Sequence, residues 1–148
     1  MRRVIIGVVI LVILAGAIAV GYYVLSQPKT AQIEIDGVTL TVELATTPAA
    51  QEQGLSDRDS MAADHGMLFI FNQEAEWGFW MHEMRFPLDI IWFDANKQVV
   101  FIEQDLPPCT PTACVVYTPP VNVLYVLEVN AGFVKANGVK LGDGFSFV

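Results

Sequence analysis

Basic residues are scarce in this chain. The sequence holds eight lysines and arginines against 16 aspartates and glutamates. Three of the basic residues, Arg2, Arg3 and Lys29, come before residue 30, whereas all the acidic residues follow it. Residues 31–148 therefore carry five positive and 16 negative side chains, a net charge of −11. Such a charge argues against binding of nucleic acid or of an anionic membrane surface, and solubility is its simplest explanation.

The sequence also lacks the motifs that identify common enzymes. It contains no G-x-S-x-G, no H-E-x-x-H and no phosphate-binding loop. Internal repeats are absent as well. We therefore expect no cofactor and assign no catalytic residue, and we favour a non-enzymatic function.

Charge is missing altogether from Val4–Leu25, a run of 22 residues that is long enough to span a bilayer. Arg2 and Arg3 in front of it predict a cytoplasmic N-terminus and a C-terminal domain on the outer side of the membrane. A membrane anchor is the favoured interpretation. The alternative is a signal peptide cleaved near Ala17–Ala19, which would leave a secreted or periplasmic protein. The predicted organisation is an anchor or signal segment at 1–25, a linker at 26–30 and a single domain at 31–148.

Only two cysteines are present, Cys109 and Cys114, in a segment rich in proline. In an oxidising compartment, a close and even pair favours a disulfide that closes a short loop. The four intervening residues do not match the C-x-x-C of redox proteins. A metal pair or a redox pair remains the alternative.

Short alternating runs and turn signals predict β-structure throughout the domain. Asp36-Gly37 lies between two such runs and predicts a hairpin of strands 31–36 and 38–45. Thr47-Pro48 predicts the start of a short helix that ends at Gly54. Further strands are expected at 66–71, 77–81, 88–93, 99–102, 121–129 and 145–148, with a turn at 72–76 and a second helix, capped by Asn130, at 131–136. The pattern predicts a mainly β fold, a small antiparallel barrel-like domain with one or two short helices.

Ordered motifs run through the whole predicted domain. They include Gly54-Leu55, Arg58, Gly66-Met67-Leu68-Phe69, Phe79-Trp80-Met81, Pro87-Leu88-Asp89, Tyr125-Val126-Leu127-Glu128 and Gly138-Val139-Lys140-Leu141-Gly142-Asp143. Together they resemble the family called domain of unknown function 192. The resemblance implies a compact, β-rich domain that is commonly exported, and it implies no particular activity. The family commonly reads Phe-Trp-Met-Lys-Asn-Thr where this chain has Phe79-Trp80-Met81-His82-Glu83-Met84, so roles of the family's lysine, asparagine and threonine do not transfer.

Asp89 stands among apolar residues in the predicted strand 88–93. A carboxylate in such a strand needs a charged or hydrogen-bonding partner, or a cleft that it faces. Arg58 and Arg85 are the only arginines after residue 30. The structural interpretation is a buried arginine–aspartate pair that fixes loop geometry. The functional interpretation is a polar floor of a binding site.

Met81, His82 and Met84 form a small group of soft ligands. Thioether and imidazole groups suit copper, especially Cu(I). In a strand, however, Met81 and His82 point to opposite faces, whereas His82 and Met84 can share one. Methionine beside aromatic residues is commonly core filler. Metal handling is therefore an alternative hypothesis.

Aromatic residues are dense around residue 80, either as core or as a stacking platform for a glycan or an apolar ligand. The favoured function is a ligand-binding or accessory module of the cell envelope, attached to the membrane by its N-terminal segment. Its ligand or protein partner is not identified by the sequence. A further alternative is an envelope hydrolase with Glu83 and Asp89 as paired carboxylates. The candidate cleft comprises Arg58, Trp80, Met81, His82, Arg85 and Asp89.

Overall fold

The computed structural model of the chain describes residues 28–110 and 112–148. The anchor or signal segment predicted at 1–25 lies outside these residues. Within them, no helix has both the length and the apolar character needed to cross a membrane. The structure thus concerns the predicted domain and the end of its linker.

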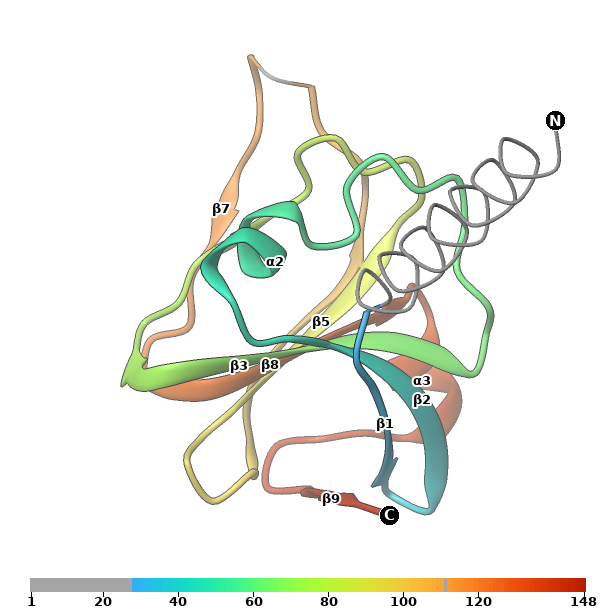
Figure 1. The fold of residues 1–148 in the computed structure, drawn as a ribbon, viewed down its shortest axis with the longest axis vertical. Coiled ribbons are helices and arrows are strands. Elements are labelled where there is room, and N and C mark those ends of the chain that lie inside the picture. Colours follow the sequence, from blue (N-terminus) through green and yellow to red (C-terminus); the bar gives the residue numbers. More distant parts are fainter. Residues whose placement is uncertain (1–27, 111) are drawn as a thin grey trace, which may run out of the picture.

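One curled sheet forms the frame of the domain (Figure 1). Its seven strands lie in the order β6-β5-β8-β3-β2-β1-β9, and β4 and β7 form a separate two-stranded sheet. The strands are β1 (Thr30–Ile35), β2 (Val38–Ala45), β3 (His65–Ala75), β4 (Phe79–Trp80), β5 (Leu88–Phe93), β6 (Val99–Leu106), β7 (Val116–Tyr117), β8 (Val123–Asn130) and β9 (Phe145–Phe147).

The sheet is a half-barrel with one parallel pair of strands, which corrects the prediction that the barrel-like sheet is antiparallel. β2 and β3 run parallel, with Thr41 opposite His65. Parallel neighbours need a long crossover connection, and the segment 46–64, which includes a helix, supplies it. The two outer strands meet at one end only, where Gln98 and Gly144 form a single antiparallel bridge. The curl therefore stops short of a closed barrel.

The first described helix, α2 (Pro48–Gln53), begins and ends as the sequence predicts. The hydroxyl of Thr47 accepts a hydrogen bond of 3.2 Å from the N–H of Ala50, which caps the helix. The helix ends at Gly54, whose φ of 50° and ψ of −136° favour glycine strongly. Figure 1 shows α2 on the same side of the sheet as β7.

The second described helix, α3 (Phe133–Asn137), lacks the predicted cap. Gly132 occupies the N-cap position, with no side-chain hydrogen bond. The Asn130 amide instead donates to the carbonyls of Met61 and Ala62, at 3.1 and 3.0 Å. Asn130 thus fixes the loop before β3 rather than the helix that follows it.

β5 lies between two apolar clusters, and all six of its residues are buried. Ile91 and Phe93 pack in a cluster with β1, β2 and α3. Leu88, Ile90 and Trp92 pack on the opposite face, in a cluster that includes Leu55, Met67, Phe69, Met81 and Met84. Burial of each large apolar side chain stabilises the fold by about 1.5–3 kcal/mol.

The segment 71–81 departs most from the predicted strands. β3 continues to Ala75, through an irregularity in its pairing with β8, where a turn was expected. The predicted strand 77–81 shortens to β4, because its partner β7 has only two residues. Trp77 instead stacks on Phe71, with ring centroids 4.2 Å apart, and its carbonyl accepts a hydrogen bond from the indole of Trp92.

Candidate functional site

A cavity of about 370 Å³ lies between α2 and the segment 80–83. We call it the outer cavity. Its lining combines one aromatic side chain with polar and acidic groups, and it contains neither lysine nor arginine: Ala49, Glu52, Gln53, Ser56, Trp80, His82 and Glu83. Two segments distant in the sequence, the helix after β2 and the connection between β4 and β5, therefore form one site.

Trp80 gives this cavity an apolar surface that is open to solvent. The residue is 55% exposed, although the neighbouring Phe79 packs inward against Phe69 and Trp92 at centroid distances of 4.8 and 5.9 Å. Alternation along β4 explains the difference, since successive side chains of a strand point to opposite faces. Trp80 also lies 5.2 Å from the ring of His82, in a tilted stack. An exposed indole beside polar groups is suited to stacking against a ligand.

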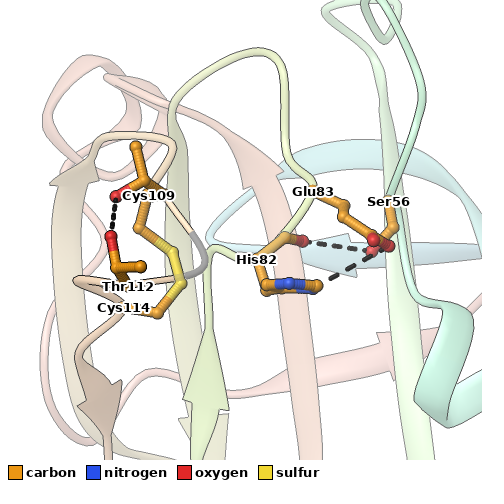
Figure 2. Close-up of a disulfide and its surroundings, with 7 residues drawn as sticks. Ser56, His82, Glu83, Cys109, Thr112 and Cys114 are labelled. Atoms are coloured by element: carbon orange, nitrogen blue, oxygen red, sulfur yellow. Dashed lines mark hydrogen bonds and ion pairs between the residues drawn. A yellow bond between two sulfur atoms is a disulfide. The ribbon is translucent and has the colours of Figure 1, made fainter.

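The polar side of the outer cavity is formed by two loops that two hydrogen bonds hold together. Ser56 Oγ donates to the carbonyl of His82 at 3.2 Å, and the N–H of Asp57 donates to the carbonyl of Glu83 at 2.9 Å. Asp57 and Glu83 have φ values of 64° and 57°, a conformation that non-glycine residues seldom adopt. Figure 2 shows Ser56, His82 and Glu83 turned toward one another, and His82 Nδ1 lies 3.8 Å from Glu83 Oε2.

Cys109 and Cys114 form a disulfide, with Cα atoms 5.1 Å apart. In Figure 2 the disulfide lies on the side of His82 away from Ser56. The N–H of Cys109 donates to the carbonyl of Met81 at 3.2 Å, and Cys109 forms a β-bridge with His82. The predicted disulfide is therefore present, and it holds one wall of the cavity.

Neither arginine pairs with Asp89, contrary to the structural interpretation of the sequence. Arg58 donates to both carboxylate oxygens of Glu43 through its two terminal guanidinium nitrogens, and this hydrogen-bonded pair lowers the pKa of Glu43 and raises that of Arg58. Arg85 lies at the surface and binds Asp57 and Asp59, at 3.1 and 2.7 Å. Both arginines therefore bind carboxylates other than Asp89, and neither of them lines the outer cavity.

Asp89 is fully buried and bound to backbone groups. Its Oδ1 accepts from the N–H of Asp105 and its Oδ2 from the N–H of Val134, each at 2.9 Å. Asp105 belongs to an irregular part of β6, where φ is 53°. Both carboxylate oxygens therefore hold β6 and α3 to β5, and the side chain of Asp89 is not exposed to solvent.

Of the three candidate metal ligands, two methionines belong to the core. Met81 and Met84 are buried in the cluster beneath α2. Only His82 lines the outer cavity. In the described residues there is no group of three or more histidine, cysteine, aspartate or glutamate side chains placed to hold a metal ion. Copper binding by Met81, His82 and Met84 stays a prediction.

The structure also reveals a buried carboxyl that the sequence analysis did not select, that of Glu128 on β8. Burial raises the pKa of Glu128 to about 8, and Arg58 opposes this only in part. The signal was the one used for Asp89, an acidic residue inside an apolar strand.

Comparison with known proteins places the domain in a family. The model of the family DUF192, described as "Uncharacterized ACR", matches residues 31–147. The chain belongs to this family. The expected resemblance to domain of unknown function 192 is confirmed over nearly the whole described domain.

Two solved structures share the fold of this DUF192 domain. A protein from Sinorhizobium meliloti 1021, provisionally described as a transcription regulator, is 35% identical with a TM-score of 0.76, and the match covers 82% of this chain and 95% of that one. A protein of unknown function from Novosphingobium aromaticivorans DSM 12444 is 29% identical with a TM-score of 0.74, and the match covers 82% and 87%. No curated protein matches the chain.

Proposed function

We propose that this DUF192 domain is a non-enzymatic ligand-binding module of the cell envelope, and that the outer cavity is its binding site. The observation that carries the proposal is the exposed indole of Trp80 at the mouth of a polar cavity. An apolar platform with a few fixed polar groups is the usual composition of a site for a small molecule. The hydrogen bonds from the Ser56 hydroxyl and the Asp57 N–H to the carbonyls of His82 and Glu83 support this site in the absence of a ligand.

The charges around the outer cavity favour a ligand that is electropositive. Glu52 and Glu83 line the cavity, and neither lysine nor arginine does. Residues 31–148 as a whole carry a net charge of −11. Such a field raises the local concentration of cations and repels anions.

Placement in the envelope rests on two features of the chain. The uncharged segment Val4–Leu25 suits a membrane anchor with the domain on the outer side. The disulfide between Cys109 and Cys114 suits an oxidising compartment. Protease added to cells stripped of their outer layers should digest the C-terminal domain of an epitope-labelled chain. A domain protected until the cells are lysed would contradict this placement.

The ligand site is tested by a thermal-shift screen of small molecules on the full-length chain. Compounds that raise the melting temperature of the native protein should lose their effect in Trp80→Ala. Leu141→Ala is the matched control, because Leu141 is also an exposed apolar residue and does not line the outer cavity. Hits that stabilise Trp80→Ala as well as the native chain would place binding elsewhere.

The hydrolase alternative gains no support from the geometry. Glu83 lines the outer cavity, but Asp89 is buried with both oxygens bound to backbone N–H groups. A general acid or base must reach a substrate directly or through one water molecule. The two carboxyl groups therefore do not form a pair around a common substrate.

A further inference from the structure

Glu128 lies beneath the site just described, with part of its carboxyl unsatisfied. It stands opposite Met67 of β3 and Ile90 of β5 and is only 5% exposed. Among the described residues, no group hydrogen-bonds its Oε2 atom. A buried polar atom without a partner costs about 1–3 kcal/mol, so native proteins seldom retain one without a role.

A small cavity of about 40 Å³ adjoins this carboxyl. We call it the Glu128 chamber. Gly54 helps to leave it open, because a Cβ there would lie 3.9 Å from Glu128 Oε2 and 3.5 Å from the Phe69 ring. The chamber has room for a group of a few heavy atoms but not for a sugar ring. Its lining consists of the turn after α2, several apolar side chains and the carboxyl: Gln51, Glu52, Gln53, Gly54, Leu55, Ser56, Phe69, Phe79, Trp80, Met84 and Glu128.

The Glu128 chamber and the outer cavity share a wall. Glu52, Gln53, Ser56 and Trp80 line both. Trp80 and its three neighbours in this wall therefore contact both spaces, and Glu128 lines only the inner one. The two spaces together resemble a site with a wide polar mouth and a narrow, aromatic end.

The charged groups around the chamber leave Glu128 without a cationic partner. Glu52 of α2 lines the same chamber and is acidic. Arg58 is the positive group that acts on Glu128, but its guanidinium is bound to Glu43. Neither lysine nor arginine lines the chamber or the outer cavity.

We propose that the Glu128 chamber receives the primary ammonium group at the end of a slender cationic ligand, with the rest of the ligand held in the outer cavity. This inference rests on the proposed function. Three observations select the ammonium group. Glu128 Oε2 has no hydrogen-bond partner among the described residues and can accept one from an ammonium N–H. The Glu128 chamber fits a small terminal group. The aromatic rings that line it, those of Phe69, Phe79 and Trp80, attract a cation. A quaternary ammonium group is bulkier and has no N–H to donate.

Binding of an ammonium group is coupled to loss of the Glu128 proton. Because burial raises the pKa of Glu128 to about 8, the free protein holds that proton at pH 7. An ammonium ligand favours the carboxylate, so binding below pH 8 releases a proton. Affinity should rise by up to about tenfold per pH unit as pH increases toward 8, and then level off. A neutral ligand that ends in a hydroxyl group has no charge that favours the carboxylate, so we expect its affinity not to rise with pH.

The experiment is isothermal titration of the full-length chain with butylammonium chloride between pH 6 and 8.5. We expect butylammonium to bind at least tenfold more tightly than 1-butanol or butyltrimethylammonium, with affinity that rises with pH. In Glu128→Gln the affinity should fall at least tenfold and lose its pH dependence. Glu103→Gln is the matched control, because Glu103 pairs with Ile90 from β6 whereas Glu128 pairs with it from β8, and Glu103 lines neither the outer cavity nor the Glu128 chamber. This variant should bind butylammonium as the native chain does.

The variants separate the two proposals. Glu128→Met removes the unsatisfied carboxyl, so this variant should melt at a higher temperature than the native chain. It should nevertheless bind butylammonium no better than 1-butanol. A stable variant with this result excludes unfolding as the cause of the lost affinity. Equal binding of butylammonium and 1-butanol by the native chain, or native affinity in Glu128→Gln, would overturn the ammonium assignment. If Trp80→Ala still abolishes the effect of screened ligands in that case, the outer cavity stands and only the Glu128 inference fails. If Glu128→Gln and Trp80→Ala both bind ligands as the native chain does, the outer cavity and the Glu128 chamber are both excluded as binding sites.

Discussion

The carboxylate of Asp89 on β5 accepts a hydrogen bond of 2.9 Å from the backbone N–H of Val134 in α3, 45 positions along the chain. Its other oxygen accepts from the N–H of Asp105, where β6 is irregular. Both donors are backbone groups that the sheet and the helix leave unpaired at these points. One buried aspartate therefore fixes the start of α3 and the shape of β6 together.

Replacement of Asp89 should destabilise the domain strongly. Asp89→Ala leaves the N–H groups of Asp105 and Val134 without acceptors, and each buried loss costs about 1–3 kcal/mol. Asp89→Asn keeps one acceptor oxygen and should lose less. Chemical denaturation measures both, with Asp94→Asn as a control at an exposed turn. A free energy of unfolding in Asp89→Ala equal to that of the native chain would show that these hydrogen bonds are not stabilising.

Removal of the disulfide should lower stability without abolishing the fold. Cys109→Ser/Cys114→Ser releases a short loop, and the chain-entropy model assigns such a loop about 2 kcal/mol. The segment at Met81 and His82 should also become more mobile, since Cys109 hydrogen-bonds to Met81. A lower melting temperature and faster amide exchange at residues 81–83 are the expected results. Two reactive thiols in the purified native protein would contradict the disulfide itself.

The stability of the domain should depend on pH through Glu128. Burial raises the pKa of Glu128 from its ordinary value of 4.5 to about 8, so the folded state binds the proton more tightly than the unfolded state does. The stability that this proton contributes is fully present below pH 4.5 and is lost progressively as pH rises toward 8. Above pH 8, Glu128 no longer changes the free energy of unfolding with pH. Its size is on the order of a few kcal/mol. Denaturation at pH 5, 6.5 and 8 should show this slope in the native chain and not in Glu128→Gln. If the free energy of unfolding changed with pH in the same way in both proteins, the pKa of Glu128 would not be raised by burial.

Backbone strain at Glu83 offers a fourth test. Its φ of 57° is unfavourable for a side chain with a Cβ, and glycine adopts it at little cost. Glu83→Gly should therefore leave stability unchanged or raise it by up to about 1 kcal/mol, while it weakens binding in the outer cavity by removing a carboxylate. Glu74→Gly, on exposed β3 backbone, is the contrasting variant and should destabilise. A marked loss of stability in Glu83→Gly would show that its side chain supports the fold.

Local sequence patterns predicted those elements whose causes are local. The Asp36-Gly37 hairpin and the helix between Thr47 and Gly54 lie where turn and cap residues place them. The strand 88–93 is recognisable because both of its faces are apolar. The disulfide between Cys109 and Cys114 was predictable from the close spacing of the pair together with the expected oxidising compartment.

Long-range partners were not predictable in the same way. The sequence shows that Asp89 needs a partner, and arginine was the plausible choice. The actual partners are backbone N–H groups, which every residue carries and no pattern distinguishes. The parallel pairing of β2 with β3 depends likewise on where the crossover returns. The outer cavity joins α2 to Trp80 across about 30 positions, so only the folded chain brings its residues together.

The most direct test of the account is a ¹³C NMR titration of the Glu128 carboxyl, in the full-length chain, with and without saturating butylammonium. In the free protein we expect an apparent pKa of about 8 for Glu128, raised by burial. With the probe bound, it predicts a pKa at least one unit lower, because the ammonium group stabilises the carboxylate. A carboxyl that titrates identically in the free and bound protein would show that the ligand does not reach Glu128.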